Sequence, residues 1–171
     1  MVIGSAVGHL LEITAPEEFD VKRGRWTFKN LPVLPPYFDL KPIKKSEEKL
    51  KALSKKIRSR AVTEVINACD AGREGELIFR YIMQSCGSKK PVKRLWRTDD
   101  EMKPLEAAAR CRSEADWLVG INGTRAMTAF NSKEGGFFLT PVGRVQTPTL
   151  AIVVKREEEI NAFVPKGYWE V

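Results

Sequence analysis

The chain has 171 residues, of which 43% are hydrophobic and 30% are charged. This length and composition suit one globular domain or two small ones, and they exclude a fibrous protein or one that is disordered throughout. Lysine and arginine number 29 against 22 aspartate and glutamate residues, and the resulting formal net charge of +7 favours a polyanionic partner such as nucleic acid.

The cysteine spacing and the hydropathy of the sequence exclude further classes of protein. Cys69, Cys86 and Cys111 are widely spaced and form no C-x-x-C pair, so the sequence predicts neither a disulfide framework nor a zinc site. No apolar run approaches the roughly 20 residues that a membrane-spanning helix needs, and residues 1–11 lack the features of a signal peptide. We therefore expect a soluble protein in a reducing, cytoplasmic setting.

The first part of the chain is expected to contain short extended segments followed by a helix. Residues 2–13 predict a strand, a turn at Gly8-His9 and a second extended stretch. Ser46 is expected to cap a helix that carries a narrow apolar stripe and otherwise lysine and arginine residues. A basic helix face of this kind usually meets only solvent.

The middle of the chain alternates between strand and helix patterns. Residues 61–69 predict a buried strand that stops at the turn Asp70-Ala-Gly72. Residues 74–84 predict a helix with one apolar side, and residues 89–96 predict a second short strand. This order of elements predicts a parallel α/β sheet.

The composition changes after Thr98 towards alanine, glutamate and arginine. Residues 102–128 predict a second, helical unit, because they contain only helix-compatible residues and isolated glycines. A further helix is expected over residues 147–159, where a Thr-Pro pair is typical of a helix start. Residues 168–171 have the pattern of a strand.

The turn after the first buried strand concentrates acidic residues. Its sequence, Asp70-Ala-Gly-Arg-Glu-Gly-Glu76, places three carboxylates and two glycines at the carboxyl end of a predicted parallel strand, where open α/β sheets bind ligands. Close carboxylates repel one another unless a cation neutralises them, so Asp70 and Glu74 can share one Mg²⁺ ion. The alternative is that they are solvated acids, favoured at a helix start by the helix dipole.

A second informative segment spans residues 143–150 and reads Gly-Arg-Val-Gln-Thr-Pro-Thr-Leu. The guanidinium of Arg144 and the amide of Gln146 lie beside a predicted helix N-terminus, an arrangement suited to binding a phosphate. A glycine turn followed by a capped helix would explain the glycine, threonine and proline. It would not explain the arginine and the glutamine.

These two segments resemble motifs of the type IA DNA topoisomerases of the bacterial topoisomerase III kind. The acidic turn is similar to the motif that holds Mg²⁺ in their TOPRIM domain, and residues 143–150 resemble a segment that contacts DNA beside the single-stranded DNA groove. The resemblance implies an α/β fold: a TOPRIM, Rossmann-like parallel sheet that lacks its first strand, followed by a smaller, mostly helical domain. It places the TOPRIM domain at residues 1–100, the helical DNA-path domain at 101–165 and the start of the next domain at 166–171.

The same resemblance implies a set of site residues. It assigns the metal to Asp70 and Glu74, with supporting roles for Arg73 and Glu76. The residues that it assigns to DNA binding are His9, Arg112, Asp116, Arg125, Gly143, Arg144, Val145, Gln146 and Thr147. Arg112 and Asp116 are four residues apart on a predicted helix, so an ordinary ion pair is an alternative for them.

The chain departs from the family pattern at several places. The third position of the acidic motif is usually Asp in the family and is Gly72 here. Nothing before Val2 resembles the family's first strand, Ala-Glu-Lys-Pro-Ser, whose Glu is catalytic, and the stretch between Trp96 and Arg112 looks shorter than in the family. The nucleophilic tyrosine of the family belongs to a later domain, and none of the tyrosines Tyr37, Tyr81 and Tyr168 has its sequence context.

The resemblance implies an ATP-independent isomerase that breaks, passes and rejoins single DNA strands through a phosphotyrosine link. Its partners would be DNA, chiefly single-stranded, and the remainder of the enzyme, at the nucleoid in the cytoplasm. We expect this chain alone to bind Mg²⁺ and single-stranded DNA without relaxing DNA. The alternatives are a non-catalytic DNA-binding module and another TOPRIM-type enzyme such as a primase or nuclease.

Overall fold

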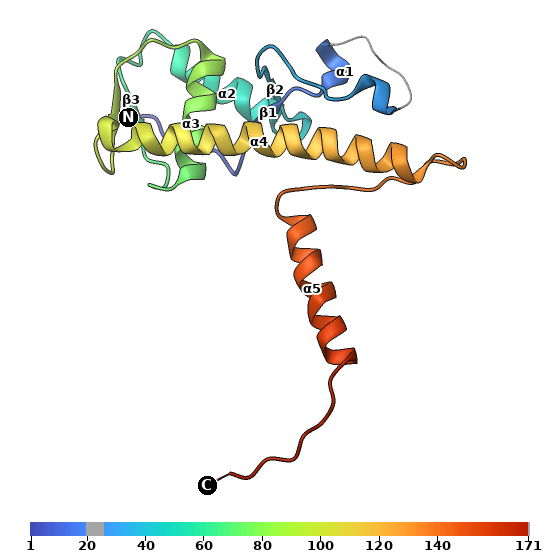
Figure 1. Cartoon of the computed structure of the whole chain (residues 1–171). Coiled ribbons are helices and arrows are strands. Elements are labelled where there is room, and N and C mark those ends of the chain that lie inside the picture. Colours follow the sequence, from blue (N-terminus) through green and yellow to red (C-terminus); the bar gives the residue numbers. More distant parts are fainter. Residues whose placement is uncertain (20–25, 171) are drawn as a thin grey trace. The chain divides into compact units, whose positions relative to one another are not determined.

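The structure is a computed structural model that describes residues 1–19 and 26–170 (Figure 1). The chain divides into two compact units. The first unit comprises Met1–Gly24 and Leu34–Trp117, and the second comprises Arg25–Val33 and Leu118–Val171.

The first unit begins with a small antiparallel sheet. Strand β1 (Leu11–Ile13) pairs with β2 (Leu40–Pro42), so that Leu11 lies opposite Pro42. The second extended stretch predicted within residues 2–13 is therefore confirmed as β1. The first predicted strand is wrong, because the described residues 2–9 form none and their apolar side chains Val2, Ile3 and Val7 are exposed without a neighbouring strand. The short helix α1 (Pro16–Phe19) and the 3₁₀ turn η1 (Phe28–Asn30) follow β1.

A parallel crossover forms the centre of the first unit. Strand β3 (Val65–Asn67), helix α3 (Arg73–Cys86) and strand β4 (Val92–Arg94) follow in the predicted order, and β3 and β4 are parallel. The α/β alternation is thus confirmed. Both strands are shorter than predicted, and the four strands in the described residues form two separate two-stranded sheets.

The hydrophobic core of the first unit lies between two helices and β1, and it also includes Ala109 from a third helix. Helix α2 (Glu47–Arg58) follows the 3₁₀ turn η2 (Lys44–Ser46) and packs against α3. The buried side chains of this core are Leu10, Leu11, Leu50, Leu77, Tyr81, Ile82, Cys86 and Ala109. Ser46 is the N-cap residue of α2 as predicted, although its side chain makes no capping hydrogen bond with the described residues.

The other end of α2 is held by a lysine. The Lys90 Nζ atom donates hydrogen bonds of 2.6 Å to the carbonyls of Ile57 and Ser59. Backbone carbonyls at a helix C-terminus lack intrahelical partners and carry partial negative charge, so a cation is favoured there. The lysine therefore connects the end of α2 to the segment that leads into β4.

Helix α4 (Asp99–Asn131) is one continuous helix that starts earlier and ends later than the predicted residues 102–128. Thr98 and Glu101 form a capping box at its start. The Thr98 backbone N–H donates to Glu101 Oε2 at 2.7 Å, and the Glu101 N–H donates to Thr98 Oγ1 at 3.4 Å. This reciprocal pair satisfies backbone donors that the helix itself leaves without partners.

In the second unit an extended segment lies along the last turns of α4. The Val142 N–H donates to Thr124 Oγ1 at 3.0 Å, and the Thr140 N–H donates to Thr128 Oγ1, also at 3.0 Å. A Cβ atom at Gly123 would lie only 2.8 Å from Val142 Cγ1. The glycine within α4 therefore makes room for this segment.

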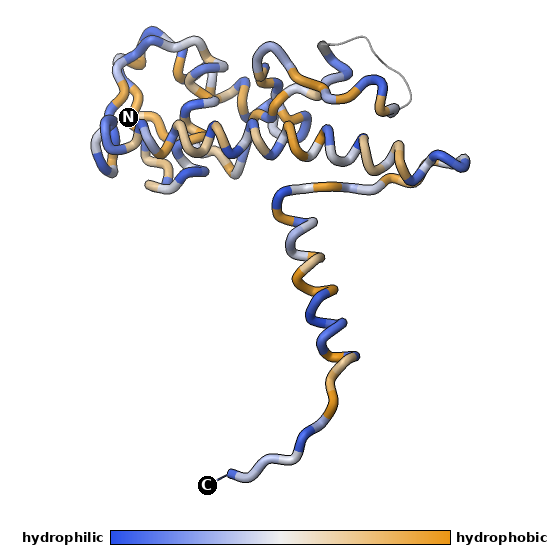
Figure 2. The backbone as a smooth tube through the Cα atoms, in the orientation of Figure 1, coloured by the Kyte–Doolittle hydropathy of each residue, from blue (hydrophilic) through white to orange (hydrophobic). Residues whose placement is uncertain are grey.

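Helix α5 (Gln146–Asn161) confirms the helix predicted at residues 147–159. Its apolar side chains, including Leu150 and Ile152, are largely exposed, and Figure 2 shows hydrophobic residues recurring along this helix. The strand predicted at 168–171 is wrong for the described residues 168–170, which adopt no regular structure, and residue 171 lies outside the described residues. Among the helices that the structure describes, none is long and apolar enough to cross a membrane.

Candidate functional site

The acidic turn connects β3 to α3 in the first unit, and its glycines make room for the carboxylate of Asp70. A Cβ atom at Gly72 would lie 2.7 Å from Asp70 Oδ2. A Cβ atom at Gly75 would overlap the Asp70 carboxylate and lie 2.5 Å from the Asp70 carbonyl oxygen. The Asp70 side chain thus folds back over the first turn of α3, which only residues without a side chain permit.

Glu74 lies on the first turn of α3 with its side chain 59% exposed. Its Oε2 atom is 3.0 Å from Nε2 of His9, which precedes β1. Two residues that the sequence assigned to different roles, metal binding and DNA binding, are therefore neighbours. Their contact spans 65 positions in the sequence, so no local pattern predicted it.

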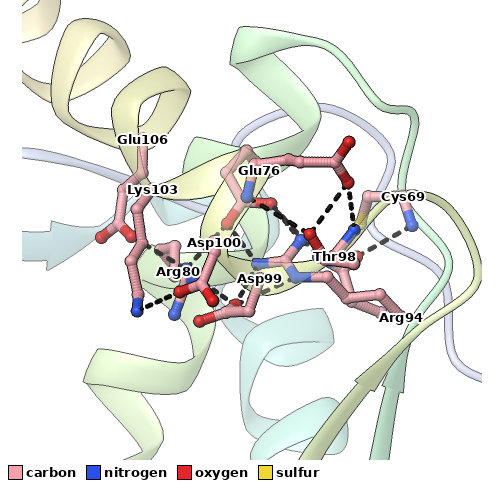
Figure 3. A network of polar contacts seen from close by, with 11 residues as sticks. Cys69, Glu76, Arg80, Arg94, Thr98, Asp99, Asp100, Lys103 and Glu106 are labelled. Carbon is pink, nitrogen blue, oxygen red and sulfur yellow. Dashed lines mark hydrogen bonds and ion pairs between the residues drawn. The ribbon is translucent and has the colours of Figure 1, made fainter.

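Glu76, the third acid of the turn, is buried in a network of charged side chains (Figure 3). Its side chain is only 1% exposed, and Arg94 donates two hydrogen bonds of 2.6 Å to its two oxygens. The Arg80 Nε atom donates a third, of 2.7 Å. Both carboxylate oxygens of Glu76 are thus engaged by guanidinium groups.

The same two arginines extend the network to α4. The Asp99 Oδ1 atom accepts hydrogen bonds from Arg80 at 2.8 Å and from Arg94 at 2.9 Å, and Arg80 also pairs with Glu106 at 3.0 Å. Figure 3 shows these side chains converging from α3, β4 and α4. The network therefore ties together the elements on either side of the acidic turn.

Burial and pairing act in opposite directions on the pKa of Glu76. Burial raises the pKa, because the charged form loses its hydration, but the hydrogen bonds from Arg94 and Arg80 outweigh this effect and lower the pKa below its usual value. Burial also raises the pKa of Asp99, but the hydrogen bond from Arg94 opposes it and the net effect is a lowered pKa. Glu76 therefore stays ionised at neutral pH, as the partner of two arginines.

Sequence reasoning placed Glu76 among the supporting residues of the site and missed Arg80, Arg94 and Asp99. Arg80 follows Glu76 by four positions on the same helix, which is the usual spacing of an ion pair. The pairing with Arg94 depends on the register of the parallel strands, in which Asn67 lies opposite that residue. A sequence pattern alone does not fix that register.

The carboxylates of the turn suit a partly hydrated cation. Within residues 1–19 and 26–170, no three His, Cys, Asp or Glu side chains form a cluster that could hold a metal ion. Asp70 and Glu74 are both exposed, and Mg²⁺ commonly takes one or two carboxylates and completes its octahedral shell with water. These two residues therefore fit Mg²⁺ in their donor chemistry, although they do not form a closed site.

The predicted DNA-binding residues of α4 have partners within the protein. The Arg112 Nε and Asp116 Oδ2 atoms are 3.8 Å apart, and both side chains are partly exposed. The ion pair that the sequence left as an alternative is therefore present, while contact with DNA stays a prediction. In the second unit, the guanidinium of Arg125 lies 5.5 Å from the ring centre of Trp26.

The segment 143–147 forms the turn into α5 in the second unit. The Gly143 N–H donates to Thr147 Oγ1 at 3.1 Å, and the Thr147 N–H donates to the Gly143 carbonyl at 3.3 Å. Arg144, Val145 and Gln146 lie between them and are exposed. The helix begins at Gln146, so this turn places the arginine and the glutamine at a helix N-terminus, as the sequence predicted.

Comparison with known proteins relates these features to one family. Residues 100–171 match the family model described as DNA topoisomerase. The chain is 43% identical over 183 residues to DNA topoisomerase 3 of Shouchella clausii, an alignment that covers 98% of this chain and 24% of that protein. It is 37% identical over 187 residues to DNA topoisomerase 3 of Bacillus subtilis, covering 99% of this chain and 25% of that protein.

The chain belongs to the type IA DNA topoisomerases, in the bacterial topoisomerase III group. It spans about a quarter of the length of the curated topoisomerase 3 relatives that it matches. The family resemblance that the acidic turn and residues 143–150 indicated is thereby confirmed.

Proposed function

We propose that this chain is part of a type IA topoisomerase that breaks, passes and rejoins single DNA strands. The similarity to topoisomerase 3 sequences over 98% of the chain carries this proposal. The crossover from β3 through α3 to β4 supports a TOPRIM-type fold for the first unit, because its acidic turn follows the carboxyl end of a parallel strand. We expect the protein to act in the cytoplasm at the nucleoid, where bacterial DNA lies.

In the intact enzyme, a tyrosine oxygen would attack a phosphodiester of single-stranded DNA. A tyrosyl oxygen–phosphorus bond forms as the bond from phosphorus to the leaving DNA hydroxyl breaks, and rejoining reverses this exchange. Because one phosphodiester replaces another, no ATP is needed. None of the tyrosines in this chain has the family's nucleophile context, and Tyr81 is buried at 5% exposure. We therefore expect this chain alone not to relax DNA.

Asp70 and Glu74 would hold Mg²⁺ at the start of α3, where a bound ion would offset the negative charge of DNA phosphates. Glu74 would exchange its contact with His9 for the ion. Arg73, exposed on the same turn, would help to orient a phosphate. Because position 72 is Gly where the family usually has Asp, the turn lacks one carboxylate, so we expect a single ion rather than a metal pair.

Single-stranded DNA would be bound by the remaining predicted residues. Arg112, Arg125 and Arg144 would meet phosphates, and each neutralised phosphate would add salt-dependent affinity. Gln146 and the turn that carries it would contact the strand beside the N-terminus of α5. His9, a residue of the first unit, would also contact DNA.

Metal binding and DNA binding test this proposal directly. Titration of Mn²⁺ as a spectroscopic substitute should show binding that Asp70→Asn and Glu74→Gln each weaken about tenfold, about 1.4 kcal/mol per ligand. Glu48→Gln, which removes an exposed carboxylate from α2, is the matched control and should leave the affinity unchanged. Equal effects of all three variants would contradict the assignment of the metal.

A non-catalytic DNA-binding module is the second candidate, favoured by Gly72 and by the lack of a three-carboxylate cluster among the described residues. It predicts single-stranded DNA binding with a steep salt dependence and no response to Mg²⁺. The similarity over nearly the whole chain to topoisomerase 3 sequences disfavours a primase or nuclease. A relaxation assay completes the test, because removal of supercoils by this chain alone would contradict the predicted inactivity.

A further inference from the structure

In the second unit, four aromatic rings each contact a cation or another ring, in two sets. We call Trp26, Phe28, Phe130 and Phe137, together with the cations Arg125 and Lys133, the aromatic cluster. The rings of Trp26 and Phe137 meet edge to face with their centres 5.7 Å apart, and the Arg125 guanidinium lies over Trp26. The Lys133 Nζ atom lies 5.6 Å from the centre of the Phe28 ring and 4.5 Å from that of Phe130.

The rings of this cluster face outward to an unusual degree. Phe28 is 51% exposed, Phe130 is 54% exposed and Phe137 is 67% exposed, and the neighbouring Phe138 is 59% exposed. Scattered single exposed apolar side chains are ordinary, but a contiguous group usually marks a binding surface. The contacts form two sets, one around Trp26 and one around Lys133, and the sets are linked along the chain because Trp26 and Phe28 are only two residues apart.

The charges around the aromatic cluster indicate which kind of molecule it binds. The segments 26–33 and 118–145 contain four basic residues, Lys29, Arg125, Lys133 and Arg144, and one acidic residue, Glu134. A protein surface that covered Lys133 would have to strip water from its ammonium group, and lysine is depleted at protein–protein interfaces. A nucleic acid would supply a phosphate for the same group.

We propose that the aromatic cluster is a stacking platform for the bases of single-stranded DNA, with Lys133 and Arg125 placed to meet the adjacent phosphates. Proteins that bind single strands without sequence preference combine aromatic side chains with cations in this way, because every base has a flat face to stack. A duplex would not fit, because its bases already stack on one another. This inference rests on the proposed function, since it assumes that the chain takes single-stranded DNA.

An abasic strand separates stacking from phosphate binding. The full chain is titrated by fluorescence anisotropy with a labelled oligothymidylate and with an oligonucleotide of equal length whose bases are absent. The unaltered chain should bind the base-bearing strand more tightly, by roughly 5- to 150-fold for each stacked base. The double variant Phe130→Ala/Phe137→Ala should lose most of this preference and keep its affinity for the abasic strand.

The matched control removes two exposed aromatic rings of the same unit that lie outside the cluster, in Phe163→Ala/Tyr168→Ala. This control should keep the full preference for bases. Equal affinity of the unaltered chain for both strands would overturn the platform and leave the proposed function standing, whereas absence of any binding to single-stranded DNA would overturn both. A preference that survives in the Phe130/Phe137 variant would also refute the platform.

Photocrosslinking provides a readout that does not depend on how the variants fold. An oligonucleotide with 5-iodouracil bases, irradiated with the unaltered chain, should form crosslinks at Trp26, Phe28, Phe130 or Phe137. Crosslinks confined to other residues, including those of the exposed surface of α5, would refute the platform. In that case the exposed rings would be better explained as a docking surface for another protein segment.

Discussion

Replacing Arg94 with methionine would leave the buried carboxylate of Glu76 without two of its hydrogen bonds. Arg94 is 6% exposed and Glu76 is 1% exposed, so water cannot readily replace the lost partner. Breaking a buried ion pair by removing one partner typically costs about 3–5 kcal/mol. Because Arg80 still donates to Glu76 at 2.7 Å, we expect the lower end of that range, about 3 kcal/mol.

Thermal unfolding followed by circular dichroism at pH 7 measures this cost. For a chain of this size, about 3 kcal/mol corresponds to a fall in Tm of about 6–12 °C. Lys93→Met is the matched control, because it breaks an exposed pair with Glu64 from the neighbouring position of β4 and should cost at most about 1 kcal/mol. If Arg94→Met lowers the Tm no more than Lys93→Met does, the buried network does not stabilise the first unit as we infer.

The double replacement Glu76→Met/Arg94→Met completes the test. It removes the buried charge together with its partner, so we expect it to be less destabilising than Arg94→Met alone. If the two losses simply add, the two side chains do not act as a pair. The interaction term of this double-mutant cycle therefore separates the ion pair from the packing of each side chain.

Three further outcomes follow from the described contacts. Because the pKa of Glu76 is lowered, its stabilising effect is fully present above the unfolded-state pKa of about 4.5 and is lost as pH falls through the folded-state pKa. The Tm difference between the unaltered chain and Arg94→Met should therefore shrink in acid, and a constant difference would contradict this. Gly75→Ala would drive a methyl group against Asp70, and we expect a loss of about 1–3 kcal/mol in urea unfolding together with weaker Mn²⁺ binding. Gly123→Ala would gain roughly 1 kcal/mol of helix propensity, but its methyl group would push against the side chain of Val142. We therefore expect the affinity for single-stranded DNA to fall while the helix content is retained.

Local patterns predicted the helices and the acidic turn well. The apolar periodicity of residues 74–84 and the glycine turn before them identified α3 to within two residues at each end, because the first signal lies inside the helix and the second directly precedes it. Asp70 lies in that glycine turn and Glu74 on the first turn of α3. The roles of these residues in metal binding stay predictions.

Features that depend on distant partners were not predictable in the same way. Strand β1 was expected as an extended stretch, but its pairing with residues 40–42 joins segments that no local pattern connects. The contact between His9 and Glu74 and the pairing of Glu76 with Arg94 likewise arise only when the chain has folded. Residue types near the site were therefore identified, whereas the partners that fix their charge and orientation were not.

Lys90, which donates hydrogen bonds at the C-terminus of α2, can serve as a chemical probe of the first unit. An amine that donates two short hydrogen bonds to carbonyls is shielded from acylating reagents, whereas the adjacent Lys89 is exposed. The ratio of modification at Lys90 to that at Lys89 would therefore register how often the last turn of α2 opens, a local fluctuation that global unfolding curves average away.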